Sequence, residues 1–442
     1  MRGLTGRLAL VGALIASICG ITIAQATTPS GATLDMHESY ALLISTYYSK
    51  VDPQRLLDGA RDALTVDLRK HHRSARLPLL RATSNADANV ALLDEAVTRV
   101  QRQTHEAPTA VTYTAIAGMA KSLGDRYTVF FTPEELRMFN SALDPAKISG
   151  IGVLIQPDDV TKYIRAFYVV PGTPAEAAGI VSGDTFLAVD GVSTKGLKTE
   201  NASKLLRGKA GSVVRVTVQH DQNPPQIVSI TRAAVQPPTV IYKMLPQNIG
   251  YIYILAFGRE TTDQFNVALD RLQRDGARAY VLDLRDDGGG YVNTAIDISS
   301  RFINNDPIVS VKERGSHITT VTADNTAISP KPMTILVNRY TASASEITAG
   351  ALQDDGIGVL VGEKTFGKGV VQTLTPLPDG AGIKITTAHY YTPKNRDINL
   401  KGIVPDVPVV ENRDARFGEV GHDLQLQAAL SLLEKKLAVL KP

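Results

Sequence analysis

Residues 333–347, with the sequence MTILVNRYTASASEI, carry the clearest indication of the fold. The first five residues are typical of a buried strand, residues 338–340 form a turn, and a helix begins at Ser343. A strand that runs directly into a helix indicates an α/β protein. Similar patterns predict further strands at 251–257, 279–284, 359–361 and 383–391, and helices at 261–275, 292–303, 343–352 and 423–440.

Ser343 is a candidate nucleophile, because the free N–H groups of a helix start can stabilise an oxyanion. No histidine lies in its segment, so Lys368, in the glycine-flanked loop 362–369, is the candidate base. Lowering its pKa to about 7 takes roughly 4–5 kcal/mol, which burial can supply. Simpler interpretations stay open: Ser343 and Glu346 fit a helix-capping box, and Lys368 fits an exposed loop lysine. A phosphate loop is disfavoured, because Gly369 stands where that motif needs a hydroxyl.

A glycine-rich turn at 288–290 follows the predicted strand at 279–284. Its backbone can approach a substrate closely, and one N–H can complete an oxyanion hole. A turn that merely needs positive φ is an equal alternative, and the spacing of a nucleotide-binding turn is absent. Asp286 and Asp287 place two negative charges beside the candidate site, where we expect them to influence peptide binding.

Between residues 148 and 236 the pattern changes to short strands separated by glycine turns. A glycine loop opens the first strand, a turn with a short helix follows at 171–180, and a hairpin follows at 183–191. In this order the three features resemble a PDZ domain of the bacterial protease type. The N–H groups of Ile151, Gly152 and Val153 would then bind a peptide's terminal carboxylate, while the peptide adds as a strand to the sheet edge.

The N-terminus is typical of an export signal. Arg2 and Arg7 precede an apolar stretch at 8–23, and residues 24–26 fit a cleavage site. An uncleaved membrane anchor is the alternative. Cys19, the only cysteine, lies in this leader, so the mature chain would have neither a disulfide nor a thiol nucleophile. We therefore expect export to a bacterial periplasm or cell envelope.

Length and composition bound the remaining choices. The 442 residues suffice for two or three domains, and the net charge of +3 without a dense Lys/Arg cluster argues against a nucleic-acid partner. His71 and His72 are interpreted as a solvated helix end and not as a metal site, on the view that no carboxylate stands beside them at ligand spacing. The polar segment 70–88 is expected to act in assembly or partner binding. The predicted parts are a signal peptide 1–26, a helical region 27–147, a PDZ domain 148–236, an α/β core 237–412 and a C-terminal helix 413–442.

Over nearly the whole mature chain the sequence resembles the C-terminal processing, or tail-specific, serine proteases, which are secreted enzymes with a PDZ domain inserted into a protease core. The resemblance implies a multidomain fold with a mixed α/β core of the ClpP/crotonase type and helical N- and C-terminal segments. The segments that carry it stand in the family's order: LGDRY at 123–127, TPEE at 132–135, the PDZ features, DLR at 283–285 with its glycine turn, the serine and lysine motifs, YTP at 391–393 and GIVPD at 402–406.

The resemblance also implies roles. Ser343 corresponds to the nucleophile, Lys368 to the general base and Gln372 to the residue that orients the lysine. The N–H groups of Ala344 and Gly289 correspond to the oxyanion hole. Because Asp286 and Asp287 replace the residues usual in the family, the choice of glycine is open by one position.

Arg207 lies in a Leu-Arg-Gly segment and is a candidate for coupling the position of the PDZ domain to the active site. The alternative is that it is an ordinary surface arginine at the end of a PDZ helix. The implied activity is cleavage of proteins near their C-termini, without a metal or cofactor. The implied partners are C-terminal tails, an activating adaptor or lipoprotein, and further copies of the chain. Two other functions are weighed: a non-catalytic PDZ peptide-binding scaffold, and a Ser-Lys hydrolase of small amides or esters.

Overall fold

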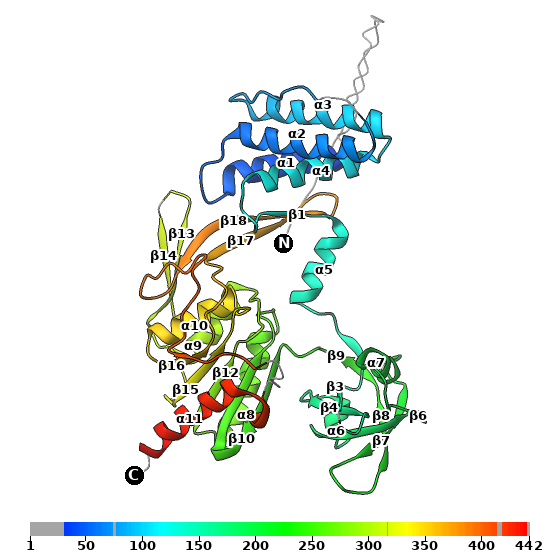
Figure 1. Ribbon diagram of the computed structural model, residues 1–442, viewed down its shortest axis with the longest axis vertical. Helices are drawn as coiled ribbons and strands as arrows, with labels where there is room; N and C mark the ends of the chain where they lie inside the picture. Colours follow the sequence, from blue (N-terminus) through cyan, green and yellow to red (C-terminus); the bar gives the residue numbers. More distant parts are fainter. Residues whose placement is uncertain (1–30, 74–76, 159, 316, 413–417, 440–442) are drawn as a thin grey trace, which may run out of the picture.

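The computed structural model describes residues 31–439 except 74–76, 159, 316 and 413–417. The expected signal peptide at 1–26 lies outside the described residues, as does the expected last residue of the C-terminal helix. Three parts are distinguished in Figure 1: a layer of helices, a small β-rich unit and a larger α/β core. None of the helices described combines the length and the apolar character needed to span a bilayer.

The helical layer, at the top of Figure 1, consists of four helices: α1 (Gly31–Thr46), α2 (Pro53–Lys70), α3 (Ala86–Thr104) and α4 (Pro108–Ser122). Their buried faces carry leucine, valine and isoleucine at helical spacing. Helices α2 and α4 approach most closely at Gly59 and Gly118, where a Cβ on either residue would lie 2.5 Å from the other's carbonyl oxygen. Only glycine permits this contact.

A short strand and a helix lead from this layer to the rest of the chain: β1 (Val129–Phe131) and α5 (Pro133–Leu143). The predicted helix start at 132–135 is confirmed, because Thr132 and Glu135 form a capping box with N–H to oxygen distances of 2.9 and 3.3 Å. Helix α5 descends past the core toward the β-rich unit (Figure 1).

The β-rich unit contains the predicted PDZ features. Strands pair in the order β3-β4-β5-β7-β8, β6 pairs with β5, and β2 pairs with β9. The short strands that the sequence predicts between residues 148 and 236 are present. The elements are β2 (Ile148–Gly150), β3 (Val153–Pro157), β4 (Ile164–Val169), α6 (Pro174–Ala177), β5 (Thr185–Val189), β6 (Val192–Ser193), α7 (Thr199–Leu206), β7 (Val213–Gln219), β8 (Gln226–Thr231) and β9 (Ala233–Val235).

A six-stranded sheet forms the centre of the core, in the order β10-β11-β12-β15-β16-β19, and all its pairs except β10–β11 are parallel. Helices α8, α9 and α10 cover one face and α11 covers the other. The elements are β10 (Val240–Leu245), η1 (Pro246–Asn248), β11 (Ile249–Ile254), α8 (Thr261–Arg274), β12 (Ala279–Asp283), α9 (Val292–Ser300), β15 (Met333–Val337), α10 (Ala344–Asp354), β16 (Gly358–Gly362), β19 (Val407–Pro408), η2 (Val420–His422) and α11 (Leu424–Val439).

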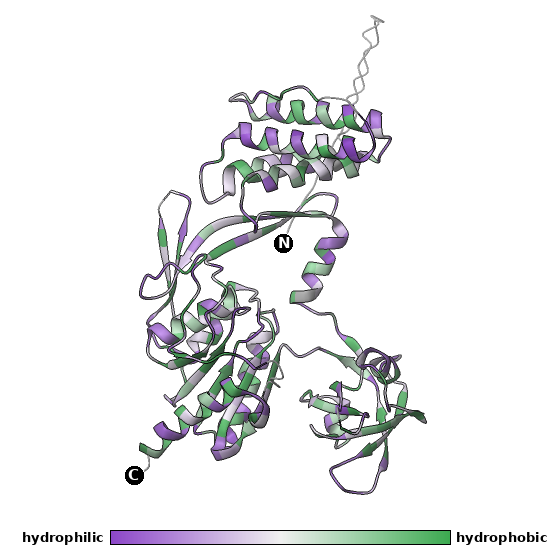
Figure 2. Ribbon diagram, viewed as in Figure 1, coloured by the Kyte–Doolittle hydropathy of each residue, from purple (hydrophilic) through white to green (hydrophobic). Residues whose placement is uncertain are grey.

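Both faces of the sheet are covered, so its strands are almost continuously apolar, as Figure 2 shows. This explains why the apolar runs at 279–284 and 333–337 predicted strands correctly. The carboxyl ends of β12 and β15 lie side by side and carry the glycine turn and Ser343, respectively. In open parallel sheets this is the edge at which ligands bind.

A second sheet joins the core to the helical layer. Its order is β1-β18-β13-β14, with β17 paired to β18. The predicted strand at 383–391 is present, but β13, β14 and β17 have mixed polar sequences and were not predicted. Their bounds are β13 (Pro307–Glu313), β14 (Ile318–Thr322), β17 (Val370–Pro376) and β18 (Gly382–Tyr391).

Candidate active site

Ser343 stands between β15 and α10 in a backbone conformation that is unusual for a serine. Its φ is +59° and its ψ is −118°, and 9% of its surface is exposed. The turn before it is fixed by Thr341, whose hydroxyl donates to the Leu284 carbonyl at 2.8 Å and accepts from the Asn338 N–H at 2.9 Å. A strained residue on a sharp strand-to-helix turn is a feature of serine nucleophiles.

The carboxylate of Glu346 connects this turn to the loop of Lys368. Its Oε2 accepts from the N–H groups of Ser343 at 3.0 Å and Lys368 at 2.8 Å, and its Oε1 accepts from the Thr365 hydroxyl at 2.5 Å and the Gly367 N–H at 2.7 Å. The predicted capping box is therefore formed. Its glutamate does more than cap a helix, because it also fixes the backbone of the lysine loop.

Lys368 has the depressed pKa that a lysine base requires. Burial and, to a smaller extent, the positive charge of Lys384 lower the pKa of Lys368 to about 8, against the opposing effects of Glu346 and Asp125. Its Nζ lies 5.2 Å from the centre of the Tyr127 ring, within cation–π range. Tyr127 and Asp125 belong to the LGDRY segment, so this N-terminal motif covers the lysine.

Gln372 lies on β17 and faces the same pocket as Ser343 and Lys368. Its side-chain amide donates to the Val370 carbonyl at 3.2 Å. Within the described part of the chain, no hydrogen bond joins Lys368 Nζ to the side chain of Ser343 or Gln372. The structure thus brings the three predicted residues to one pocket without linking their functional atoms.

The glycine turn packs directly against Ser343. A Cβ on Gly289 would lie 2.6 Å from the Ala342 oxygen, 2.7 Å from the Ala344 nitrogen and 2.8 Å from the Ser343 Cβ, and φ of Gly289 is +91°. The Gly289 N–H donates to Asp287 Oδ1 at 2.8 Å. The family resemblance implies this N–H for the oxyanion hole, but in the structure it already donates to Asp287. At the neighbouring Gly288, the other candidate, a Cβ would meet open space.

Asp287 does not bring the expected negative charge to a peptide-binding surface. The residue is almost fully buried, and burial raises the pKa of its carboxyl to about 8. The hydrogen bond from Gly289 only partly opposes this effect. Burial thus favours the uncharged form of this carboxyl, and its Oδ1 accepts a hydrogen bond from the backbone of the turn.

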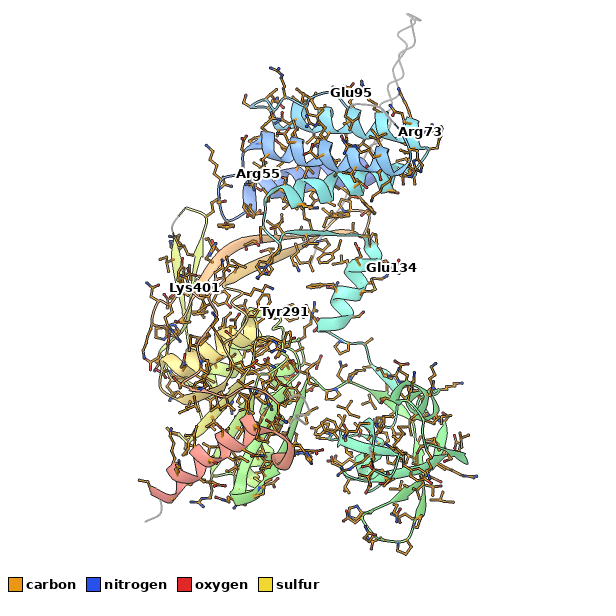
Figure 3. All side chains as sticks on the ribbon, in the orientation of Figure 1. Arg55, Arg73, Glu95, Glu134, Tyr291 and Lys401 are labelled. Carbon is orange, nitrogen blue, oxygen red and sulfur yellow. The ribbon has the colours of Figure 1, made fainter. Side chains whose placement is uncertain are left out.

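The pocket between these elements has a volume of about 410 Å³. Apolar residues of α5, of the segment directly after β11 and of β17 form its walls, and the Ser343 side chain, the glycine turn and Lys368 line its polar part. Tyr291, labelled in Figure 3, fixes the α5 side, because its hydroxyl donates to Asp144 Oδ2 at 2.8 Å. Lys384 also lines the pocket. Sequence reasoning missed it, since nothing in the run 383–391 distinguishes this lysine from a surface residue.

Arg285 fixes the segment that precedes the glycine turn. It is fully buried, and its guanidinium binds Asp283 at 2.5 and 2.9 Å and Asp423 at 2.7 and 3.0 Å. Burial alone would lower the pKa of Arg285, but the two carboxylates raise it. The DLR segment thus joins the end of β12 to the residue that precedes α11.

The predicted PDZ residues also meet at one place. Ile151, Gly152, Val153 and Arg207 line a pocket of about 110 Å³ between the glycine loop and α7. The carbonyls of Ile151 and Gly152 accept from Ala175 and Val170, as the backbone returns past the loop. The four residues thus line one pocket beside β3, which is the edge strand of its sheet.

Comparisons with known proteins agree with this architecture. The model for peptidase family S41 matches residues 248–409, and the PDZ domain model matches residues 168–220. The carboxyl-terminal-processing protease of Picosynechococcus sp. is 39% identical over 333 residues, which cover 74% of this chain and 80% of that protein. Its counterpart from Synechocystis sp. is 37% identical over 335 residues, covering 74% and 78%. The solved photosystem II D1 C-terminal processing protease is 29% identical, with a TM-score of 0.47 and coverage of 86% and 94%.

Proposed function

The chain belongs to the carboxyl-terminal-processing proteases of peptidase family S41, and we propose that Ser343 and Lys368 are its nucleophile and general base. As a member of that family, it is a serine endopeptidase that acts near the C-termini of proteins. The proposal for the two residues rests chiefly on Glu346, which binds the backbone N–H groups of both with one oxygen.

The chemistry follows from this placement. Neutral Lys368 takes the proton of the Ser343 hydroxyl, and Ser343 Oγ attacks the peptide carbonyl carbon. The N–H of Ala344 and one N–H of the glycine turn stabilise the oxyanion. Protonated Lys368 then gives its proton to the leaving amine. Water hydrolyses the acyl-enzyme, with Lys368 again accepting the proton.

We infer that the described arrangement precedes catalysis. Lys368 Nζ lies over the Tyr127 ring, and the Gly289 N–H is held by Asp287. In the working site Nζ turns toward Ser343 Oγ, and Gln372 accepts a hydrogen bond from it. The Gly289 N–H, or the neighbouring Gly288 N–H, is then presented to the substrate.

The PDZ domain is proposed to capture the substrate's C-terminal tail. The N–H groups of the loop at Ile151, Gly152 and Val153 would bind the terminal carboxylate, and the tail would extend β3 as an added strand. Arg207 stands at the end of α7 beside the same pocket, where its charge would attract the carboxylate. In this proposal the cut falls near the tail that the PDZ domain holds.

Export to the periplasm or cell envelope is proposed on the leader sequence. An adaptor or lipoprotein that activates the enzyme, and assembly of several copies through the terminal helices, are further proposals. Size-exclusion chromatography with light scattering measures the number of copies and any complex with candidate envelope lipoproteins, and the cleavage rate with and without them measures activation.

The direct test is proteolysis of an unfolded protein with an apolar C-terminus, with the products identified by mass spectrometry. Lys364 is an exposed lysine of the same loop, so Lys364→Ala serves as a control. The wild type and Lys364→Ala are both expected to cut the substrate near its tail. Ser343→Ala and Lys368→Ala are expected to lose cleavage by at least about 10³-fold. Equal cleavage by all four proteins would contradict the assignment. Amidation of the substrate's C-terminus should raise KM, because it removes the charge that the PDZ loop binds.

A further inference from the structure

A cluster of three metal-ligating side chains lies in the helical layer, far along the chain from the protease site. Asp67 is in the last turn of α2, His71 directly follows that helix, and Glu106 follows α3. One ligand atom from each residue lies within 4.8 Å of the other two. Arg73, labelled in Figure 3, marks this end of the helical layer.

The course of the chain between α2 and α3 explains why Glu106 lies beside Asp67 and His71. Gln54, at the start of α2, donates to the Leu80 carbonyl at 2.8 Å and accepts from the Ala82 N–H at 2.9 Å. The segment between α2 and α3 therefore returns along α2, and α3 begins near the start of α2. The two helices run in parallel, which brings both of their C-terminal ends together.

The view that no carboxylate stands beside His71 at ligand spacing was wrong. Asp67 precedes it by four residues, which is one helical turn. Glu106 could not be recognised from sequence, because its approach depends on the parallel packing of α2 and α3.

His71 is oriented in the way that protein metal ligands are oriented. Its Nδ1 lies 3.0 Å from the Asp67 carbonyl oxygen, so Nδ1–H donates there and Nε2 keeps its lone pair. That Nε2 lies 3.4 Å from Glu106 Oε1. Two ligands of a tetrahedral zinc ion are about 3.3–3.4 Å apart when each is about 2.0–2.1 Å from the metal. The observed separation fits such an edge.

The Asp67 carboxylate supplies the independent sign of a ligand. Only 8% of its surface is exposed, and its Oδ2 has no hydrogen-bond partner among the described residues. A ligand atom of the Glu106 carboxyl lies within 4.8 Å of one of Asp67. Two carboxyl groups held this close need either a cation or a shared proton between them.

We propose that Asp67, His71 and Glu106 bind a divalent first-row transition ion, with Zn²⁺ as the best-fitting member of the class. An imidazole ligand favours Zn²⁺ over Mg²⁺ and Ca²⁺, which prefer sets made entirely of oxygen. Three protein ligands leave a fourth position for water. The site is structural in this account, because the ion would join the end of α2 to the segment that follows α3.

The test uses the full mature chain after chelation and dialysis. Calorimetric titration with Zn²⁺ and visible absorption after Co²⁺ addition measure binding, and thermal unfolding measures its effect on stability. The wild type is expected to bind one equivalent and to unfold at a higher temperature with Zn²⁺. Asp67→Asn and Glu106→Gln are expected to weaken binding at least about tenfold.

Two neighbouring histidines provide matched controls. His72 and His105 are exposed and have positive φ, which asparagine tolerates, so His72→Asn and His105→Asn should bind as the wild type does. Without metal, Asp67→Asn should unfold at the same or a higher temperature than the wild type, which separates lost binding from misfolding.

Three outcomes would overturn the proposal. The first is wild-type binding that the Asp67 and Glu106 variants leave unchanged. The second is binding that disappears in the two histidine controls. The third is that Zn²⁺ neither binds to the wild type nor raises its unfolding temperature.

Discussion

Glu346 Oε2 accepts hydrogen bonds from the backbone of both Ser343 and Lys368, at 3.0 and 2.8 Å. One buried carboxylate oxygen thus sets the distance between the nucleophile's turn and the base's loop. Burial raises the pKa of Glu346, whereas its four hydrogen bonds favour the charged form. The relationship makes the geometry of the candidate dyad depend on a residue that takes no part in the proposed chemistry.

Replacing Glu346 by glutamine should therefore damage catalysis more than substrate binding. The amide nitrogen would face two backbone or hydroxyl donors that need an acceptor, and each unsatisfied buried group costs about 1–3 kcal/mol. We expect Glu346→Gln to lower kcat at least about tenfold with KM changed little, and to lower the free energy of unfolding. Steady-state kinetics and denaturant unfolding measure both effects.

Glu134→Gln is the control for that substitution, because Glu134 is an exposed residue of α5. A Glu346→Gln enzyme with wild-type kcat would show that the carboxylate does not position the site.

The pH dependence of the rate should report Lys368. Its pKa of about 8 predicts that kcat/KM rises with pH and levels off above about 8, because only the neutral amine is a base. Lys384 lowers that pKa by charge repulsion, so Lys384→Met should move the rising limb to higher pH. Lys364→Met should leave the limb in place. An unchanged profile for Lys384→Met would refute the coupling.

Asp287 should make the protein less stable at high pH. In the unfolded chain its carboxyl loses its proton near the ordinary pKa of 3.8, but in the folded chain only near 8. Between these values the folded state binds more protons, so the free energy of unfolding falls as pH rises and stays low above about 8. Asp287→Asn removes this contribution, and the curves should diverge by up to about 1.4 kcal/mol per pH unit.

Denaturant unfolding of both proteins from pH 4 to pH 9 tests the Asp287 assignment. Parallel curves over that range would mean that the carboxyl is charged in the folded state.

The glycine turn offers a sharp steric test. In Gly289→Ala the new Cβ would lie 2.7 Å from the Ala344 nitrogen and would force a strained positive φ. We expect loss of activity and a lower unfolding temperature. Gly288→Ala is the matched control, because its Cβ would meet open space and its N–H is retained. Equal activity of the two variants would contradict the close packing.

Sequence patterns predicted the parts of this fold that depend on interactions between residues close together in the chain. The apolar run at 333–337 becomes a strand because both faces of its sheet are covered, and Ser343 follows it as expected. The motifs around Ser343 and Lys368 also identified which residues share a pocket. What the sequence could not provide is the direction of single groups: the Gly289 N–H turns to Asp287, and Gln372 binds its own strand.

The missed features depend on contacts between distant segments. Lys384 enters the site through the antiparallel pairing of β17 with β18, where it stands opposite Leu374. Tyr127 reaches Lys368 because β1 pairs with β18. Neither register follows from local propensity. The same limit applies to Glu106, whose contact with His71 arises from the path of the chain between α2 and α3.

The central claim is that Ser343 forms the covalent intermediate with Lys368 as its base. Enzyme that is acid-quenched during turnover of an unfolded substrate can be digested and mapped by mass spectrometry for an attached acyl fragment. The fragment is predicted on Ser343 in the wild type and in Lys364→Ala, and absent from Ser343→Ala and Lys368→Ala. An acyl fragment on another residue, or on Ser343 of Lys368→Ala at the wild-type rate, would contradict the account.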